Sequence, residues 1–257
     1  MSSIVKNTTF PSLLDLLSPP SCEICGTLGS ILCHRCKNNI ISLAPNICPN
    51  CKSKTVLGRC QNCLDLPQTF VAGVRSEPIG TLIYNYKFNS TRCLAKPLTE
   101  IMFTVLSKTL PREPLNPLLS PSKNHHESHK NYKTHRGPEN VIIVPLPTIA
   151  KHIRERGFDH TYLLARHLSR LTSYRLEKLL LRAKNTVQVG SDAKTRKTQA
   201  NHAYALNPKI KIDPSATYLL LDDIWTTGAS MKAALNKLRE AGIENIIIAV
   251  LAVNKAT

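Results

Sequence analysis

The chain has 257 residues, and its 34 lysines and arginines outnumber its 17 aspartates and glutamates, which gives a formal charge of +17. A hydrophobic content of 42% excludes a chain that is disordered throughout, and the length fits one or two domains. The excess of positive charge predicts an anionic partner: nucleic acid, a phosphorylated small molecule or an acidic membrane surface.

Cysteines dominate the first part of the chain. Eight of the nine form four C-x-x-C pairs, which are Cys22/Cys25, Cys33/Cys36, Cys48/Cys51 and Cys60/Cys63. One such pair supplies two of the four thiolates of a tetrahedral zinc site, so the four pairs predict two structural zinc ions. Sequential pairing is the simplest arrangement, and an interleaved one stays open. Disulfides and redox dithiols are the less favoured alternatives. We expect Cys93, the ninth cysteine, to be a small buried hydrophobe.

Residues 1–69 are poor in apolar periodicity, so we expect zinc to hold them together as a double zinc-ribbon module. The start of the chain lacks the pattern of a secretory signal, and no apolar run reaches the length of about 20 residues that spans a bilayer. These features predict a cytoplasmic protein without a membrane span.

Residues 70–257 change to helix and strand patterns. In chain order the patterns predict helices at 79–88 and 96–110, a strand at 141–144, a helix at 158–171, a strand at 217–221, a helix at 229–241 and a strand at 246–250. Between the second helix and the first strand, residues 111–139 form a low-complexity insert that we expect to be solvated and mobile. Apolar strands that alternate with helices predict an α/β domain with a parallel sheet.

The segment from 218 to 230 carries the strongest functional signal. An apolar strand leads to Asp222 and Asp223, and a turn then opens a helix. That turn contains Thr226, Thr227, Gly228, Ala229 and Ser230. Backbone amides and hydroxyls at a helix N-terminus can bind a phosphate, and paired acids suit ribose hydroxyls, directly or through Mg²⁺. The alternative is an ordinary capped turn between strand and helix.

This segment resembles the 5-phosphoribosyl-1-pyrophosphate (PRPP) motif of type I phosphoribosyltransferases, and most of the chain resembles the ComF family of competence-associated proteins. The ComF resemblance also rests on the four cysteine pairs and on three short motifs. These are Tyr86-Lys87-Phe88, Val144-Pro145-Leu146-Pro147 and Arg156-Gly157-Phe158. It implies a phosphoribosyltransferase-like parallel sheet flanked by helices, with the zinc-ribbon module in front of it.

The resemblance also implies roles for single residues. Asp222 and Asp223 would face the ribose, residues Thr226 to Ser230 the 5′-phosphate, and Pro147 and Thr148 the pyrophosphate, with Mg²⁺ accompanying PRPP. A mobile loop within 182–202 would cover the site and place Arg196 there. The chain departs from the family at Asp159-His160, where Asn-Gln is usual.

Two classes of function follow. One is an enzyme that transfers phosphoribose from PRPP to an acceptor that the sequence does not identify. The other is a competence factor that binds single-stranded DNA or docks a helicase during DNA uptake, and a PRPP-sensing regulator is a third alternative. Residues 151–211, with fourteen basic and four acidic side chains, motivate the DNA hypothesis. We expect His160 and His202 to be surface residues, and Trp225 either to stack on a ligand ring or to pack against the sheet.

Overall fold

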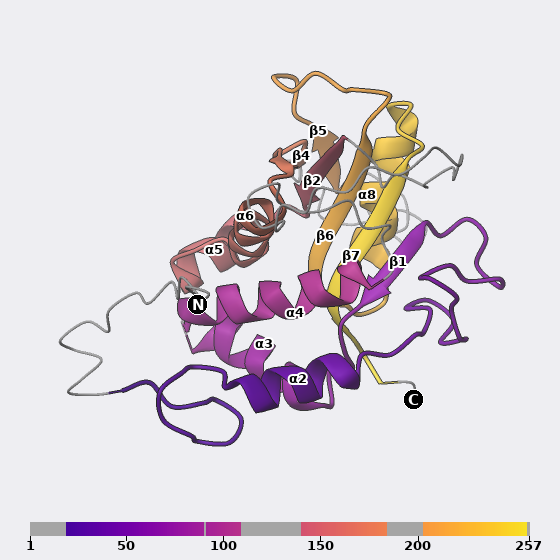
Figure 1. Cartoon of the computed structure of the whole chain (residues 1–257). Helices are drawn as coiled ribbons and strands as arrows, with labels where there is room; N and C mark the ends of the chain where they lie inside the picture. The colour runs from indigo at the N-terminus through magenta and orange to yellow at the C-terminus, as the bar shows by residue number, and fades with distance from the viewer. Residues whose placement is uncertain (1–18, 90, 109–139, 184–202, 256–257) are drawn as a thin grey trace, which may run out of the picture.

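The computed structural model describes residues 19–89, 91–108, 140–183 and 203–255 (Figure 1). The predicted insert, the loop that contains Arg196, and His202 lie outside these ranges. Within them, no helix combines the length and the apolar character that a bilayer span requires.

A parallel sheet of five strands forms the centre of the molecule. Its strands are β1 (Gln68–Val71), β2 (Val141–Pro145), β3 (Arg175–Leu176), β6 (Thr217–Trp225) and β7 (Ile246–Val253). They lie in the order β1-β7-β6-β2-β3. Leu219 of β6 fixes the register at the centre, since it pairs with Ile143 on one side and with Ile247 on the other. The predicted α/β fold class is confirmed.

Helices cover both faces of the sheet, which explains the continuous apolar runs of the central strands. One face packs against α3 (Pro78–Phe88), α4 (Ala95–Ser107) and α6 (His160–Thr172), with α2 (His34–Ser42) packed outside α4, and the other face packs against α8 (Ala229–Glu240). Because side chains alternate along a strand, Leu219 and Leu221 point to the first face and Leu220 to the second. Figure 1 shows α4, α3 and α2 in succession beside the sheet.

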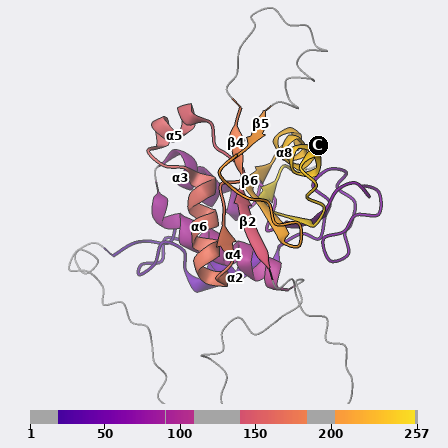
Figure 2. The same cartoon turned by 90° about the horizontal axis from the view of Figure 1, so that it is seen from above.

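Three smaller elements frame the carboxyl ends of the strands. The short helix α5 (Ala150–Arg156) follows β2 and ends at Gly157, whose φ of 72° is easily adopted by glycine. Strands β4 (Leu180–Arg182) and β5 (Tyr204–Leu206) form an antiparallel pair. Seen from above in Figure 2, this pair lies between α5 and α8.

The sequence-based elements are confirmed in type, with different ends. The helix expected at 96–110 is α4, which follows a short 3₁₀ turn, η1 (Arg92–Leu94), and ends at Ser107, and residues 109–110 lie outside the described ranges. The strand expected at 217–221 continues to Trp225, so both acids of the phosphate motif lie inside β6 and not after it. The expectation for Cys93 is wrong: its side chain is exposed, because the turn η1 buries Leu94 instead.

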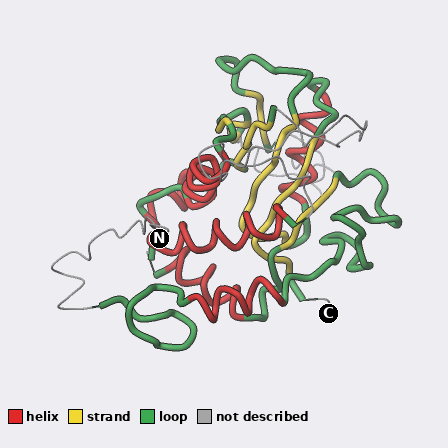
Figure 3. Tube along the Cα trace, in the orientation of Figure 1, coloured by secondary structure: helices red, strands yellow, loops and turns green. Residues whose placement is uncertain are grey.

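The cysteine-rich segment contains α2 and otherwise mostly loops (Figure 3). Cys36 and Ile40 of α2 are buried in the same hydrophobic cluster as Leu98 of α4, so the first cysteine cluster packs directly on the α/β core. The strand β1 begins at Gln68, shortly before the proposed module boundary at 69/70. Division into two domains stays a prediction.

Candidate functional site

Two groups of four cysteines are assembled in the first part of the chain. Cys22, Cys25, Cys33 and Cys36 form one group, and Cys48, Cys51, Cys60 and Cys63 form the other. In each group the Sγ atoms all lie within 4.8 Å of one another. The structure therefore supports the sequential pairing, and four thiol donors per group are a ligand set that suits tetrahedral zinc. Each group could hold one structural ion.

Local hydrogen bonds stabilise the thiolate form of two of these cysteines. The side chain and backbone of Thr27 lower the pKa of Cys25 to about 5, and those of Ser53 lower the pKa of Cys51 to about 6. Since zinc binds the thiolate, both shifts favour metal binding near neutral pH.

A cavity of about 200 Å³ lies at the carboxyl ends of β2 and β6, where parallel α/β sheets bind ligands. Its volume is below the roughly 300–1,000 Å³ of a typical small-molecule pocket, so it suits part of such a ligand. The cavity collects side chains from the loop after β2, from helices, from the β4–β5 pair and from β6. They are Lys87, Leu146, Pro147, Thr148, Ile149, His152, Arg156, His160, Thr161, Arg182, Tyr204, Asp222 and Ser230.

The two neighbouring acids of β6 have opposite environments. Asp222 is half-buried on the cavity wall, where burial, followed by the charge of Asp223, raises its pKa well above the ordinary value. Asp223 is buried, and its Oδ2 lies 2.5 Å from Nζ of Lys87 and 3.1 Å from Nε2 of His160. Burial alone would raise the pKa of Asp223, but the interactions with His160 and Lys87 outweigh it and hold the pKa well below the usual range.

His160 lies at the start of α6 and is only 6% exposed, so the expectation of a surface histidine is wrong. The helix turns it inward because Asp159 caps the N-terminus, accepting from the backbone N–H of Tyr162 at 3.1 Å. Asp159 also accepts from Thr148 Oγ1 at 2.8 Å, which ties the loop after β2 to α6. On its other side, His160 Nδ1 lies 3.0 Å from Nη1 of Arg156.

The turn between β6 and α8 requires glycine at position 228. Gly228 has a φ of 77°, and a Cβ there would lie 2.5 Å from the ring of Trp225. Trp225 is 2% exposed and packs in the core. Of the two expectations for Trp225, packing against the sheet is therefore the one that the structure shows. Thr226, Thr227, Ala229 and Ser230 are exposed on this turn, and Ser230 lines the cavity.

The structure therefore brings together one part of the predicted site. Pro147, Thr148, Asp222 and Ser230 share the cavity. Asp223 and the turn residues from Thr226 to Ala229 are not among its lining residues, and Arg196 lies outside the described residues. Lys87 and Tyr204 were not predicted as site residues. Lys87 stands in the Tyr86-Lys87-Phe88 motif, which was the only signal for it, and Tyr204 carries no sequence signal.

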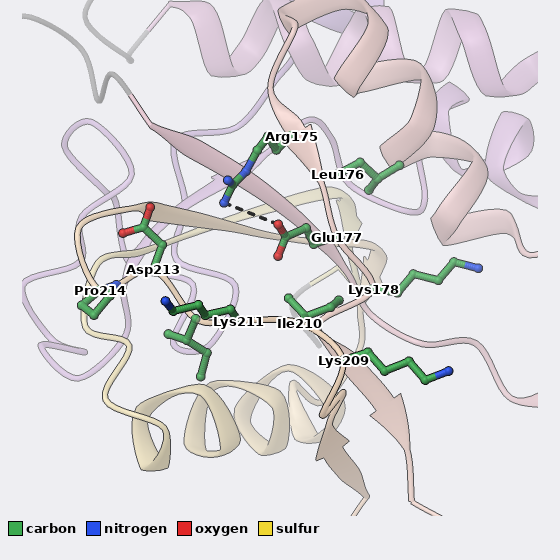
Figure 4. Close-up of a pocket in the computed structure, with 10 residues that line it drawn as sticks. Arg175, Leu176, Glu177, Lys178, Lys209, Ile210, Lys211, Asp213 and Pro214 are labelled. Atoms are coloured by element: carbon green, nitrogen blue, oxygen red, sulfur yellow. Dashed lines mark ion pairs between the residues drawn. The ribbon is translucent and has the colours of Figure 1, made fainter.

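A larger cavity of about 720 Å³ lies near the amino ends of β2 and β6 (Figure 4). Four basic side chains line it together with Glu177 and Asp213, and Arg175 Nη2 lies 3.4 Å from Glu177 Oε1. This edge of the sheet is opposite to the one where open parallel sheets bind ligands. Position, and not volume, therefore identifies the smaller cavity as the candidate site.

Comparison with known proteins gives two relatives over most of the chain, while no family model matches. Competence protein F of Haemophilus influenzae is 27% identical over 225 residues, which cover 84% of this chain and 87% of that protein. Competence protein ComFC of Bacillus subtilis is 22% identical over 222 residues, covering 82% of this chain and 79% of that protein. Together with the α/β fold and the paired cysteine clusters, these similarities agree with the resemblance of this chain to the ComF family.

Proposed function

We propose that the cavity at the carboxyl ends of β2 and β6 binds PRPP or a related phosphoribosyl ligand together with Mg²⁺. One observation carries the proposal: the loop after β2 and the turn after β6 meet there, with Asp222, Thr148 and Ser230 lining the same cavity. A hydroxyl-bearing turn at the start of α8 suits a phosphate, and the Asp222 carboxylate suits ribose hydroxyls or the water shell of Mg²⁺.

The charge of the cavity is consistent with this ligand. Among the described lining residues, Lys87, Arg156 and Arg182 stand with one carboxylate, that of Asp222. Cationic side chains that face a departing pyrophosphate lower the barrier to transfer of the ribose, so the same residues would support phosphoribosyl transfer to an acceptor. Asp223 is not among the lining residues; we propose that it acts by holding Lys87 and His160 in place.

The names of the two relatives place them in competence, and we propose that this protein likewise serves DNA uptake. The two cysteine clusters would have a structural role in it. All eight thiols are needed for two four-coordinate sites, which leaves no open position for metal-based catalysis at these clusters.

Calorimetric titration with PRPP and Mg²⁺ tests the proposal. We expect saturable binding by the full chain and a loss of about tenfold or more in affinity for Asp222→Asn, because a hydrogen bond to a charged group contributes roughly 1.5–3 kcal/mol. Lys209→Ala, in the larger cavity, is the matched control and should leave the affinity unchanged. Equal affinity of the Asp222 variant and the unmodified protein would refute the site.

A competence factor that binds single-stranded DNA is the second candidate. It is favoured by the net +10 charge of residues 151–211, to which Arg154, Arg166 and Arg170 contribute. If DNA phosphates replace counterions on this surface, the affinity should fall steeply with salt concentration. A flat salt dependence, or no binding near physiological salt, would exclude this candidate.

A further inference from the structure

Two arginines from different elements line the cavity in similar settings. Arg156 ends α5, and its guanidinium lies 5.2 Å from the ring centre of Phe88. Arg182 ends β4, and its guanidinium lies 4.7 Å from the ring centre of Tyr204. Stacking on an aromatic ring fixes the plane of a guanidinium while its N–H groups stay available for other partners.

Each arginine is also held by one hydrogen-bond acceptor. Arg182 donates from Nε to the carbonyl oxygen of Pro147 at 3.1 Å. Arg156 Nη1 lies 3.0 Å from Nδ1 of His160. A guanidinium has five N–H donors, so each of these anchors leaves most of the donors free for a ligand.

The contact between Arg156 and His160 fixes where the imidazole carries its proton. Since a guanidinium has no acceptor, a hydrogen bond between the two groups requires Nδ1 to accept, which places the ring proton on Nε2. Thr148 Oγ1, 3.4 Å from Nδ1, can then donate to it as well. Nε2 lies 3.1 Å from Oδ2 of Asp223. The contact with Oδ2 is an electrostatic one and not a formed hydrogen bond, and the negative charge beside Nε2 favours the tautomer that binds Arg156.

We propose that Arg156 and Arg182 form a paired receptor for the diphosphate end of the ligand, and that His160 is the positioning residue for Arg156. The inference rests on the proposed function and assigns residues to one end of its ligand. Two guanidinium groups on one small cavity suit two adjacent phosphates, each of which can accept a bidentate pair of N–H bonds.

Neighbouring groups support this assignment. Lys87 lines the same cavity, but it is paired with Asp223, so the arginines are the better placed cations among the described lining residues. The Tyr204 hydroxyl is buried close to Ser230 and Asp222, and no hydrogen bond within the described ranges satisfies it. It is therefore a further donor for a ligand oxygen at the side of Arg182.

Calorimetry with inorganic pyrophosphate, using the full zinc-loaded chain, tests the receptor. Arg156→Ala and Arg182→Ala should each lower the affinity about tenfold or more. Arg154→Ala, an exposed neighbour on the same helix that does not line the cavity, should leave it unchanged. Inorganic phosphate should bind more weakly than pyrophosphate. Unchanged affinity in both receptor variants would overturn the assignment.

Two substitutions of His160 distinguish a role in positioning Arg156 from a general role in the stability of the fold. In His160→Asn, the amide oxygen of asparagine can replace Nδ1 as the acceptor for Arg156. In His160→Gln, the longer side chain places its amide at the position of Nε2, so Arg156 loses its acceptor. We expect His160→Asn to retain pyrophosphate affinity and His160→Gln to lose as much as Arg156→Ala. The double variant, His160→Gln plus Arg156→Ala, should lose no more than either single variant. Equal affinities for the two His160 variants would refute the positioning role.

A measurement on the unmodified protein remains decisive even where a variant fails to fold. The ¹⁵N chemical shifts of His160 should show a proton on Nε2 and none on Nδ1, and protonation on Nδ1 would refute the role of His160. Titration with PRPP and Mg²⁺ distinguishes the proposed PRPP site from the proposed diphosphate receptor. If the protein binds PRPP but all variants keep the pyrophosphate affinity of the unmodified protein, the diphosphate receptor is refuted and the PRPP site is not. Absence of binding for both ligands overturns the proposed function itself.

Discussion

Lys87 and Asp223 form a close ion pair, with Nζ 2.5 Å from Oδ2, although they come from distant parts of the chain. The pair joins the last turn of α3 to the end of β6, and Lys87 lines the cavity whereas Asp223 does not. Only 5% of the Asp223 side chain and 16% of the Lys87 side chain are exposed. Loss of either partner therefore leaves a buried charge that water cannot reach freely.

Replacement of Lys87 by methionine should destabilise the protein. The variant keeps most of the side-chain volume but removes a charge partner of Asp223, so we expect a loss of about 3 kcal/mol in the free energy of unfolding. Urea denaturation followed by circular dichroism measures it. Lys37→Met is the matched control, because its pair with Glu100 is more exposed and should be worth about 0–1 kcal/mol. Equal losses in the two variants would contradict the special role of the buried pair.

Replacement of Asp222 and of Asp223 by asparagine should change the free energy of unfolding in opposite directions. At pH 7 Asp223→Asn leaves the poorly exposed Lys87 ammonium without its carboxylate partner and should cost about 3 kcal/mol of stability. Asp222→Asn removes a carboxylate whose charged form is disfavoured in the folded state, and it should gain about 1 kcal/mol. Urea denaturation at pH 7 compares them, and a loss of stability in both would show that burial of Asp222 is not unfavourable.

The pH dependence of the two variants follows from the direction of each pKa shift. The pKa of Asp223 is depressed in the folded state, so its contribution is present above the unfolded pKa of about 3.9 and disappears as the pH falls toward the folded value. The pKa of Asp222 is raised, so the gain from Asp222→Asn should shrink as the pH falls and the native carboxyl takes up a proton. Denaturation at pH 7 and at about pH 5 measures the change for Asp222→Asn, and denaturation at about pH 3, below the unfolded pKa, measures the loss of the Asp223 contribution. A gain from Asp222→Asn that grows on acidification would reverse the assignment.

Glycine at position 228 should be required for packing as well as for backbone conformation. Gly228→Ala places a methyl group against the ring of Trp225, whereas Gly242→Ala has a similar φ of 79° and nothing within 4 Å. The control should lose about 1–2 kcal/mol from backbone strain alone, and Gly228→Ala clearly more. Trp225 is the single tryptophan, so its fluorescence reports the change directly. Identical losses and an unaltered emission spectrum would contradict the contact.

The metal content should be two zinc ions per chain, bound independently. Cys48→Ser removes one ligand of the second group and should lower the content to one ion, because the first group keeps its four thiols. Elemental analysis of both proteins measures this. One ion in the unmodified chain, or none in the variant, would contradict two separate four-cysteine sites.

The sequence predicted the fold where local signals agree. The apolar runs of β2, β6 and β7 predicted the three central strands, and helical periodicity predicted α3, α4, α6 and α8. The edge strands β1, with 4 residues, and β3, with 2 residues, were not predicted, because they are too short for a clear pattern. Sequential pairing was the simplest reading of the cysteine spacing, and the structure groups the cysteines in the same order.

The parts that the sequence did not predict depend on tertiary contacts. His160 looks like a solvent-exposed helix residue, but Asp223, Arg156 and Thr148 surround it only after α5, α6 and β6 have come together. The acids of β6 were expected after the strand, because no local pattern shows that Ile224 and Trp225 continue to pair with Ala252 and Val253 of β7.

A crystal structure of the full chain soaked with PRPP and Mg²⁺ tests the central claim most directly. It should show the 5′-phosphate at the turn from Thr226 to Ser230, the ribose beside Asp222, and the diphosphate between Arg156 and Arg182. Density for PRPP in the cavity beside Arg175 and Lys211, or at no ordered position at all, would contradict the proposed site.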